Sequence, residues 1–361
     1  MRWHSDNLRR QFLPGAICAI ALILLSNLGI LQPLEHLAYQ ALFVLRGEQA
    51  WDQRVVVITI DDRTLATLGR FPFNRNHYSR LLKVLTQAES SVVAFDMIWS
   101  ESSAEDAELA QAIAQQGNVV LSQAWDNLGL PLVPVERLRS VASNLGHIQK
   151  QVDIDGQARN VQASLHDIPA LAIATIQAYS LSHDVAALPN LNSTLWVNWL
   201  RSQKHTLSYS LLDVVQNRVP IQNLKDKIVL VGITAVGLDE LVTPFDRTPP
   251  TSGVYLHATL VNNLLQQNLV RVIPKNWFLV CLGLFSLGLS RCLDRWRTFY
   301  QVGVGWGLAI AWVVLCWSAL KFGSIWLPVA TPLLLVFTVV SFVLLQERLS
   351  LNAILQRQVQ Q

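Results

Sequence analysis

The chain has 361 residues, of which 51% are hydrophobic and 15% are charged. Ordinary soluble domains carry about 25% charged residues, so this composition favours a membrane protein over a wholly soluble one. The formal net charge is only +3, and the sequence has no Lys- and Arg-rich run. Because such runs are typical of nucleic-acid binding, we expect no nucleic-acid partner.

The first apolar segment covers residues 12–31, which carry no charge over a length that could cross a bilayer. Arg2, Arg9 and Arg10 precede it, and the segment is too long for the apolar part of a typical signal peptide. The sequence therefore predicts an uncleaved transmembrane signal anchor, with residues 1–11 in the cytoplasm.

Residues 32–274 follow as a predicted extracytoplasmic domain. Short apolar runs in it have the length of strands, and several are continuous in valine and isoleucine, as in a sheet that is buried on both faces. These predicted strands are Val55–Ile60, Val92–Asp96, Val119–Ser122, Leu195–Trp199 and Ile228–Ile233. Alternation of strands and helices predicts an α/β domain with a mostly parallel sheet and flanking helices.

The predicted helices between these strands rest on apolar residues at helical spacing. They include Tyr78–Leu85, Leu109–Ile113, Ile168–Leu181 and His257–Leu269. Residues 149–161 differ, because their pattern predicts a β-hairpin with Asp155 and Gly156 at the turn.

Polar side chains follow three of the predicted strands. Ligands of open α/β sheets bind at the carboxyl ends of the strands, so these side chains are ligand-binding candidates. They are Asp61 and Asp62 after the first strand, Asp96 at the end of the second, and Asp239 and Thr243 after the last. Arg75 and His77, after the turn FPFNR, could reach such a crevice if the strands are parallel neighbours. Arg75 and His257, which opens a predicted helix, complete the set of candidates.

Each candidate also has a structural interpretation. Asp61 or Asp62 could cap a short helix over Thr64–Gly69, because Asp is a preferred N-cap residue. Asp96 could form a buried salt bridge with Arg75, and such a pair is costly to break whether or not a ligand binds. His257 could be a core histidine without a ligand.

The sequence predicts no catalytic residue, metal site or cofactor. Asp153, Asp155 and Gly156 resemble the start of a calcium loop, but Ala158 and Ser164 stand where that loop needs Gly and Glu. The common hydrolase, zinc and phosphate-loop motifs are absent from the sequence. The four cysteines lie in or beside apolar segments at the chain ends and are expected to act as small hydrophobic residues.

A predicted three-helix transmembrane region covers residues 277–345, with spans at about 277–293, 299–320 and 325–345. Arg291, Arg295 and Arg297 occupy the first loop, and Arg348 and Arg357 follow the last span. The positive-inside rule then places the N-terminus, this loop and the tail of residues 346–361 in the cytoplasm. Because the spans carry no mid-membrane Asp, Glu or Lys, an anchor and relay is favoured over a transporter.

The sequence resembles the type 2 CHASE domain, from the cyclase/histidine-kinase-associated sensory extracellular family. Six blocks in the family's order carry the resemblance: VVVITIDDRTLATLGRFPFNRNHYSRLL, SVVAFDMIWSE, GHIQKQVDIDGQARNV, LWVNWL, KDKIVLVGITAVGLDELVTPF and GVYLHATLVNNLL. The family's recurrent polar positions fall on Asp61, Arg75, Asp96, Asp155-Gly156, Arg159, Asp239, Thr243-Pro244, Gly253 and His257. Phe71 and Phe73 stand where the family often has tryptophan, and Ser252 where it usually has proline.

The resemblance implies a non-enzymatic sensor or receptor of a signal-transduction system. It would lie in the bacterial inner membrane, with a periplasmic sensor domain and an unknown extracytoplasmic ligand. Family members usually continue into a cyclase or kinase domain, whereas only a short tail follows Leu345 here. We therefore expect a module without its own output domain, which would act through a cytoplasmic kinase or cyclase partner and could form a homodimer.

Two other functions stay open at this point. The domain could be an envelope scaffold that binds another protein and no small ligand. Less in keeping with the sequence, it could be a membrane-bound hydrolase that uses its aspartates with a metal ion, although no set of nucleophile, base and oxyanion donors accompanies them.

Overall fold

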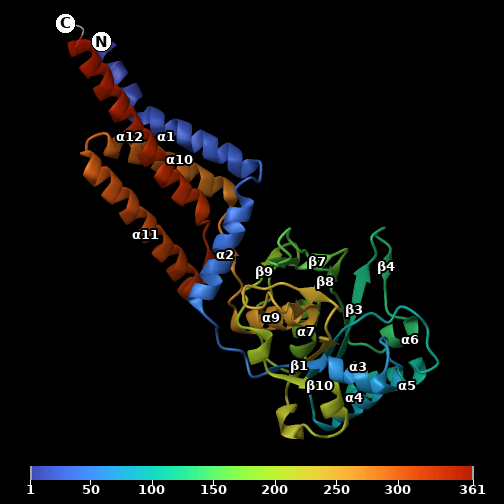
Figure 1. Cartoon of the computed structure of the whole chain (residues 1–361). Helices are drawn as coiled ribbons and strands as arrows, with labels where there is room; N and C mark the ends of the chain where they lie inside the picture. Colours follow the sequence, from blue (N-terminus) through green and yellow to red (C-terminus); the bar gives the residue numbers. More distant parts are fainter. Residues whose placement is uncertain (1, 360–361) are drawn as a thin grey trace. The chain divides into compact units, whose positions relative to one another are not determined.

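The computed structural model describes residues 2–359, with side chains over residues 11–358 (Figure 1). Residues 1, 360 and 361, at the ends of the predicted cytoplasmic segments, lie outside the described residues. The chain divides into two compact units, one of residues 1–46 and 271–361, the other of residues 47–270. Residues 32–46 and 271–274, which we assigned to the extracytoplasmic domain, thus belong to the helical unit.

The unit of residues 47–270 is built on a seven-stranded sheet with the order β10-β1-β11-β2-β3-β4, in which β5 also pairs with β3. All pairings in it are parallel except that of β3 with β4. The strands are β1 (Val55–Ile60), β2 (Val92–Asp96), β3 (Val119–Trp125), β4 (Pro131–Leu132), β5 (Asn144–His147), β10 (Ser208–Ser210) and β11 (Ile228–Ile233). The predicted parallel-rich α/β fold is therefore confirmed.

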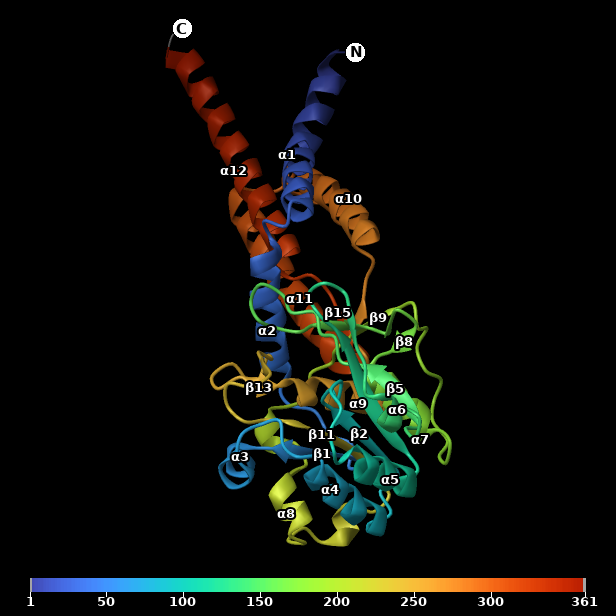
Figure 2. The same ribbon diagram turned by 90° about the vertical axis from the view of Figure 1, so that its right-hand side faces the viewer.

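Helices cover both faces of this sheet (Figure 2). One face packs against α4 (Asn76–Gln87), α5 (Asp106–Gln116), α6 (Glu136–Arg139) and α8 (Leu211–Val215). The other packs against α7 (Leu171–Tyr179) and α9 (Gly253–Gln266). The remaining short helices are α3 (Asp62–Leu68) and two 3-10 turns, Gln203–His205 and Ile221–Asn223.

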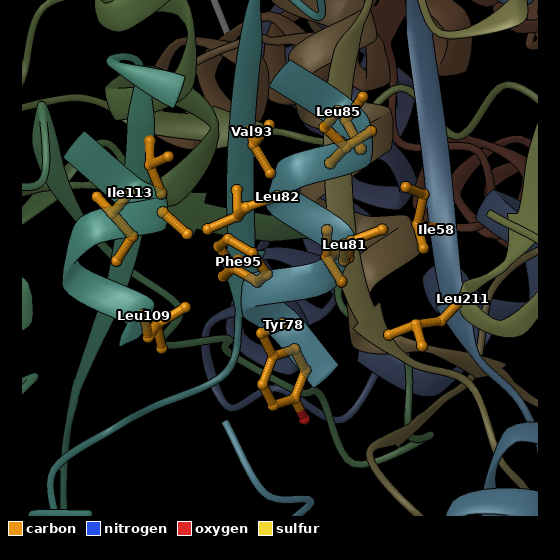
Figure 3. Close-up of a cluster of buried hydrophobic side chains, with 14 of the residues drawn as sticks. Ile58, Tyr78, Leu81, Leu82, Leu85, Val93, Phe95, Leu109, Ile113 and Leu211 are labelled. Carbon is orange, nitrogen blue, oxygen red and sulfur yellow. The ribbon is translucent and has the colours of Figure 1, made fainter. Parts of the chain in front are cut away.

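The largest apolar core of this unit lies between the sheet and α4, α5 and α8 (Figure 3). Side chains from alternate positions of β1 and β2, such as Ile58, Val93 and Phe95, share this core with Leu82 of α4 and Ile113 of α5. All five side chains are fully buried. At about 1.5–3 kcal/mol for each fully buried aliphatic or aromatic side chain, this core is a main source of the unit's stability.

Short two-stranded ladders complete the unit. They pair β6 (Asn160–Gln162) with β9 (Thr194–Trp196), β7 (Ser164–Leu165) with β8 (Ile168–Pro169), and β12 (Glu240–Leu241) with β13 (Thr251–Ser252). The predicted strand Leu195–Trp199 is found in part, as β9, which pairs with β6 and not with the large sheet. The backbone beyond β9 bonds elsewhere. The amide of Val197 donates to Arg159 O at 2.9 Å, and that of Asn198 to Asn263 Oδ1 at 2.9 Å.

The predicted hairpin over residues 149–161 is found only near its tip. Gln151 pairs with Asn160 in an isolated antiparallel bridge, and the Asp153 amide donates to Gln157 O at 2.9 Å. Gly156 has φ 79°, a left-handed conformation that glycine adopts without strain. Beyond the bridge the chain departs from the hairpin, because β6 pairs with β9 instead.

The helical unit holds α1 (Arg2–Asn27), α2 (Gln32–Arg46), α10 (Lys275–Leu293), α11 (Thr298–Gly323) and α12 (Ala330–Val359). Three of them, α10, α11 and α12, are long and apolar enough to cross a membrane. The N-terminal span predicted for residues 12–31 is supported only in part, because α1 is long and apolar enough to cross a membrane only together with α2, as one bent pair. The helix ends at Asn27, Gly29 takes a left-handed φ of 75°, and α2 leaves at 85° to α1.

α1 packs closely against α10 because small residues line their contact. A Cβ atom on Gly15 would lie 2.5 Å from the Ser286 carbonyl oxygen. The hydroxyls of Ser286 and Ser290 donate to the carbonyls of Gly15 and Gln11, both at 2.7 Å. Small residues and serine hydroxyls at helix contacts are typical of helices that pack within membranes.

The start of α12 is held by two other segments of the helical unit. β14 (Arg271–Val272) pairs with β15 (Ile325–Trp326), which is why the helix begins later than the predicted span at 325. The Glu35 carboxylate of α2 accepts hydrogen bonds from the amides of Val329, Ala330 and Thr331 at 2.8, 3.2 and 2.7 Å. Glu35 thus caps an N-terminus that lies almost 300 residues away in sequence.

Candidate ligand-binding site

A cavity of about 690 Å³ opens at the carboxyl edge of the parallel sheet. Strand β11 is followed by α9 on one face, whereas its neighbours β1 and β2 lead to α4 and α5 on the other, so the connections diverge here. Such a point is where open α/β sheets bind ligands. The cavity is lined by residues 71–73, 75, 96–103, 124, 148–150, 233, 239 and 257.

Asp96, at the floor of the site, belongs to a row of residues that pair across three strands. Thr59 of β1 pairs with Gly232 of β11, and Gly232 pairs with Asp96 of β2. Gly232 allows α9 to approach, because a Cβ atom there would lie 2.5 Å from the Val254 Cβ. This close approach brings His257, one turn further along α9, to the carboxylate of Asp96.

Asp96 and His257 form a buried pair with a long separation. Their side chains are 6% and 2% exposed, and His257 Nε2 lies 3.8 Å from Asp96 Oδ1, beyond hydrogen-bond distance. Burial raises the pKa of Asp96 to about 7, and the Asp239 carboxylate adds to that rise while Lys150 opposes it. Burial, with the positive charge of Lys150, lowers the pKa of His257 to about 3, so the imidazole is neutral near pH 7.

The two cationic side chains of the cavity each have an acidic partner. Arg75 pairs with Asp106 of α5, and their side chains are only 8% and 7% exposed. Arg75 also donates to the backbone carbonyl of Glu101. Lys150 pairs with Asp239. The predicted alternative of an Arg75–Asp96 salt bridge is wrong, because the guanidinium is held by Asp106 and Glu101.

Aromatic side chains form part of the cavity wall. Phe71 and Phe73 lie edge to face with ring centroids 5.6 Å apart. Trp99, which is 7% exposed, packs against Phe95 at 4.9 Å. The cavity therefore combines charged groups with apolar rings, as small-molecule sites commonly do.

Four of the predicted candidates, Arg75, Asp96, Asp239 and His257, line this cavity. Asp61, Asp62 and Thr243 do not. Asp61 caps α3, as its Oδ1 accepts from the Thr64 amide at 2.8 Å. Asp62 Oδ1 accepts from the Val236 amide at 3.1 Å, and Thr243 Oγ1 accepts from the Asp246 amide at 2.8 Å. These three side chains therefore hold loops in place.

Lys150, Glu101 and Trp99 line the cavity but were not among the candidates. Glu101 and Trp99 come shortly after β2, so the rule of strand carboxyl ends could have found them. Lys150 follows β5, whose sequence NLGH lacks the apolar run that marks a strand. The sequence thus gave no signal for Lys150.

Neither a metal-binding cluster nor an activated nucleophile is found among the described residues of this cavity. Within the described part of the chain, no set of three His, Cys, Asp or Glu ligand atoms converges in this cavity. Among the same residues, His257 makes no hydrogen bond to a hydroxyl or thiol that it could activate. Its Nδ1 is buried without a hydrogen-bond partner.

Comparison with known proteins identifies the family. A model of the CHASE2 domain matches residues 16–290, which is most of the chain. Neither the curated proteins nor the solved structures that were searched contain a match.

Proposed function

Because the chain belongs to the CHASE2 family of extracellular sensory domains, we propose that it is a membrane-anchored receptor that binds an extracytoplasmic ligand. The observation that carries this proposal is the cavity at the sheet edge, with Asp96 and His257 buried at its floor. Buried ionisable groups with shifted pKa values cluster at functional sites, because they would otherwise only reduce stability.

Membrane anchoring follows from the apolar helices α10, α11 and α12. We propose that residues 47–270 face the extracytoplasmic side of a bacterial inner membrane and that the arginine loop at 291–297 and the end of α12 lie in the cytoplasm. The arginines of that loop and Arg348 and Arg357 support this orientation.

The signal would leave through α12, which continues past its apolar part to Val359. Leu349, Ile354 and Leu355 on that extension are between 54% and 60% exposed. An apolar stripe of this kind could contact a cytoplasmic kinase or cyclase partner or a second copy of the chain. A ligand would act by favouring one of two arrangements of the receptor.

A scaffold that binds another envelope protein is the second candidate. The domain's exposed apolar side chains, such as Leu128 at 85% and Ile154 at 103%, would suit such a role. The cavity favours the receptor, because a scaffold has no need for a buried, partly unpaired carboxylate.

The test is a thermal-shift screen of the full chain in lipid nanodiscs against a bacterial metabolite extract and its fractions. A ligand well above its dissociation constant stabilises the protein by a few kcal/mol. We expect a fraction that raises the unfolding temperature of the wild type and not of Asp96→Ala. Lys83→Gln, which removes an exposed charge of α4 outside the cavity, is the matched control. If no fraction shifts the wild type while the chain captures an envelope protein, the scaffold is correct.

A further inference from the structure

The charges of the cavity identify a class of ligand, an inference that rests on the proposed receptor function. We propose that the cavity binds a small organic cation, with its charged nitrogen next to Asp96 and its carbon groups next to Phe71, Phe73 and Trp99.

The unmatched charge of the cavity is negative. Arg75 is already bound to Asp106, and Lys150 to Asp239. Among the described residues, Asp96 has only His257 within ion-pair distance, and a neutral imidazole at 3.8 Å does not balance a carboxylate. An added positive charge would therefore meet an acceptor without breaking an existing ion pair, whereas an anion would have to displace Asp106 or Asp239.

The groups around Asp96 do not balance the negative charge of its carboxylate. It faces His257 from α9, Asp239 and Lys150 from two loops, Arg75 from the start of α4, and Glu101 from the loop after β2. Asp239 raises the pKa of Asp96 and Lys150 lowers it, but burial is the largest cause and brings the value to about 7. A bound cation would favour the ionised carboxylate and displace its proton.

The aromatic wall suits the apolar part of such a ligand. Phe71, Phe73 and Trp99 all line the cavity that contains Asp96. Aromatic rings attract alkylammonium groups through the negative potential of their faces. They would gain nothing comparable from a carboxylate or a phosphate.

An inorganic cation fits less well. Calcium takes six to eight oxygen ligands, and magnesium needs near-octahedral geometry. Within the described residues, the acidic and histidine side chains of this cavity do not converge on one point. A volume of about 690 Å³ also suits an organic molecule better than a single ion.

The experiment measures binding of three matched probes to the full chain in nanodiscs by calorimetry. They are choline, its uncharged isostere with carbon in place of nitrogen, and tert-butylacetate as the related anion. We expect choline to bind at least tenfold more tightly than either of the others. Its affinity should rise as the pH increases through about 7, the pKa of Asp96, because the proton competes for the carboxylate.

Two variants with opposite expected effects on choline binding distinguish an organic cation from other classes of ligand. Asp96→Asn keeps the shape of the side chain and should abolish the preference for choline and its pH dependence. Lys150→Gln removes a competing positive charge and should tighten choline binding several-fold. Lys83→Gln makes the same chemical change outside the cavity and should leave the affinity for choline unaltered.

The outcomes show separately whether the proposed ligand class is wrong and whether the proposed receptor function is wrong. If the anion binds most tightly, or if Lys150→Gln weakens choline binding, the organic-cation class is wrong. If no probe binds but a metabolite fraction still shifts the wild type and not Asp96→Ala, the class is again wrong and the receptor function stands. If neither probes nor fractions bind, both proposals fail.

Discussion

The two faces of the central sheet differ most at the carboxyl ends of the strands. On the face toward α4 and α5, the side chains remain apolar to the end, as at Ile60, Phe95 and Leu121. On the face toward α7 and α9, the same strands end in Thr59, Gly232, Asp96 and Ser122. One face therefore supplies an uninterrupted core, while the other becomes polar where the cavity begins.

Because of this difference, neighbouring residues of one strand have different roles: one contributes to stability and the next to the binding site. Phe95 and Asp96 are adjacent in β2 and point to opposite faces, because side chains alternate along a strand. Substitutions at such neighbours can test the division directly, since they leave the backbone position almost unchanged.

The largest effect is expected at the apolar face. Phe95→Ala should lower the free energy of unfolding by about 3–5 kcal/mol, because it removes a fully buried ring and leaves a cavity. Urea denaturation of the full chain in nanodiscs measures this change. The neighbouring Asp96→Asn should cost far less at neutral pH. Equal losses for both variants would mean that the two faces do not divide their roles.

The polar face should impose a pH dependence that the apolar face lacks. Because the pKa of Asp96 is raised to about 7, Asp96 keeps its proton in the folded state and loses it in the unfolded chain between about pH 4 and pH 7. The contribution of Asp96 to stability is therefore present below that range and is lost as the pH rises through about 7.

The buried His257 acts in the opposite direction. Its pKa is lowered to about 3, so its contribution to stability is present above the unfolded value near 6.5 and is lost as the pH falls toward about 3. The comparison of wild type with Asp96→Asn isolates the aspartate. Relative to the variant, the wild type should lose roughly 1 kcal/mol per pH unit between about pH 4 and pH 7. A constant difference over this range would contradict the raised pKa.

The smallest of the three effects is expected at the contact between β11 and α9. Gly232→Ala places a methyl group 2.5 Å from the Val254 Cβ, and such overpacking typically costs about 1–3 kcal/mol. Since the helix must move outward, His257 should move away from Asp96, and ligand binding should weaken along with stability. Thermal unfolding and calorimetry on the same sample measure both. A stable variant with unchanged binding would show that the close approach does not position His257.

Much of the sheet could be predicted because its central strands are continuously apolar. Val55–Ile60, Val92–Asp96 and Ile228–Ile233 have in the structure the bounds that the sequence predicts. Strands β5 and β10 could not be found, since Asn144–His147 and Ser208–Ser210 carry polar residues and pair near the sheet edges. Leu195–Trp199 has the composition of a sheet strand, but side chains such as Asn263 take its backbone hydrogen bonds.

The site could be predicted only in part for a related reason. The strand-end rule correctly brings Asp96 and Asp239 to one cavity. It does not distinguish a carboxylate that faces a cavity from one that caps a helix, as Asp61 does. The insertion of β11 between β1 and β2 is also invisible in the sequence, because strand order depends on contacts between distant segments.

The capping of α12 by Glu35 makes the length of one helix depend on the position of another. Three amides at the start of α12 have the Glu35 carboxylate of α2 as their acceptor. If α2 withdraws, these amides lose their partner, and in a water-poor setting each unsatisfied amide costs several kcal/mol. The first turn would then unwind or rotate to find other acceptors. A movement of α2 would thus change where α12 begins, so that the length of this helix would report the position of α2.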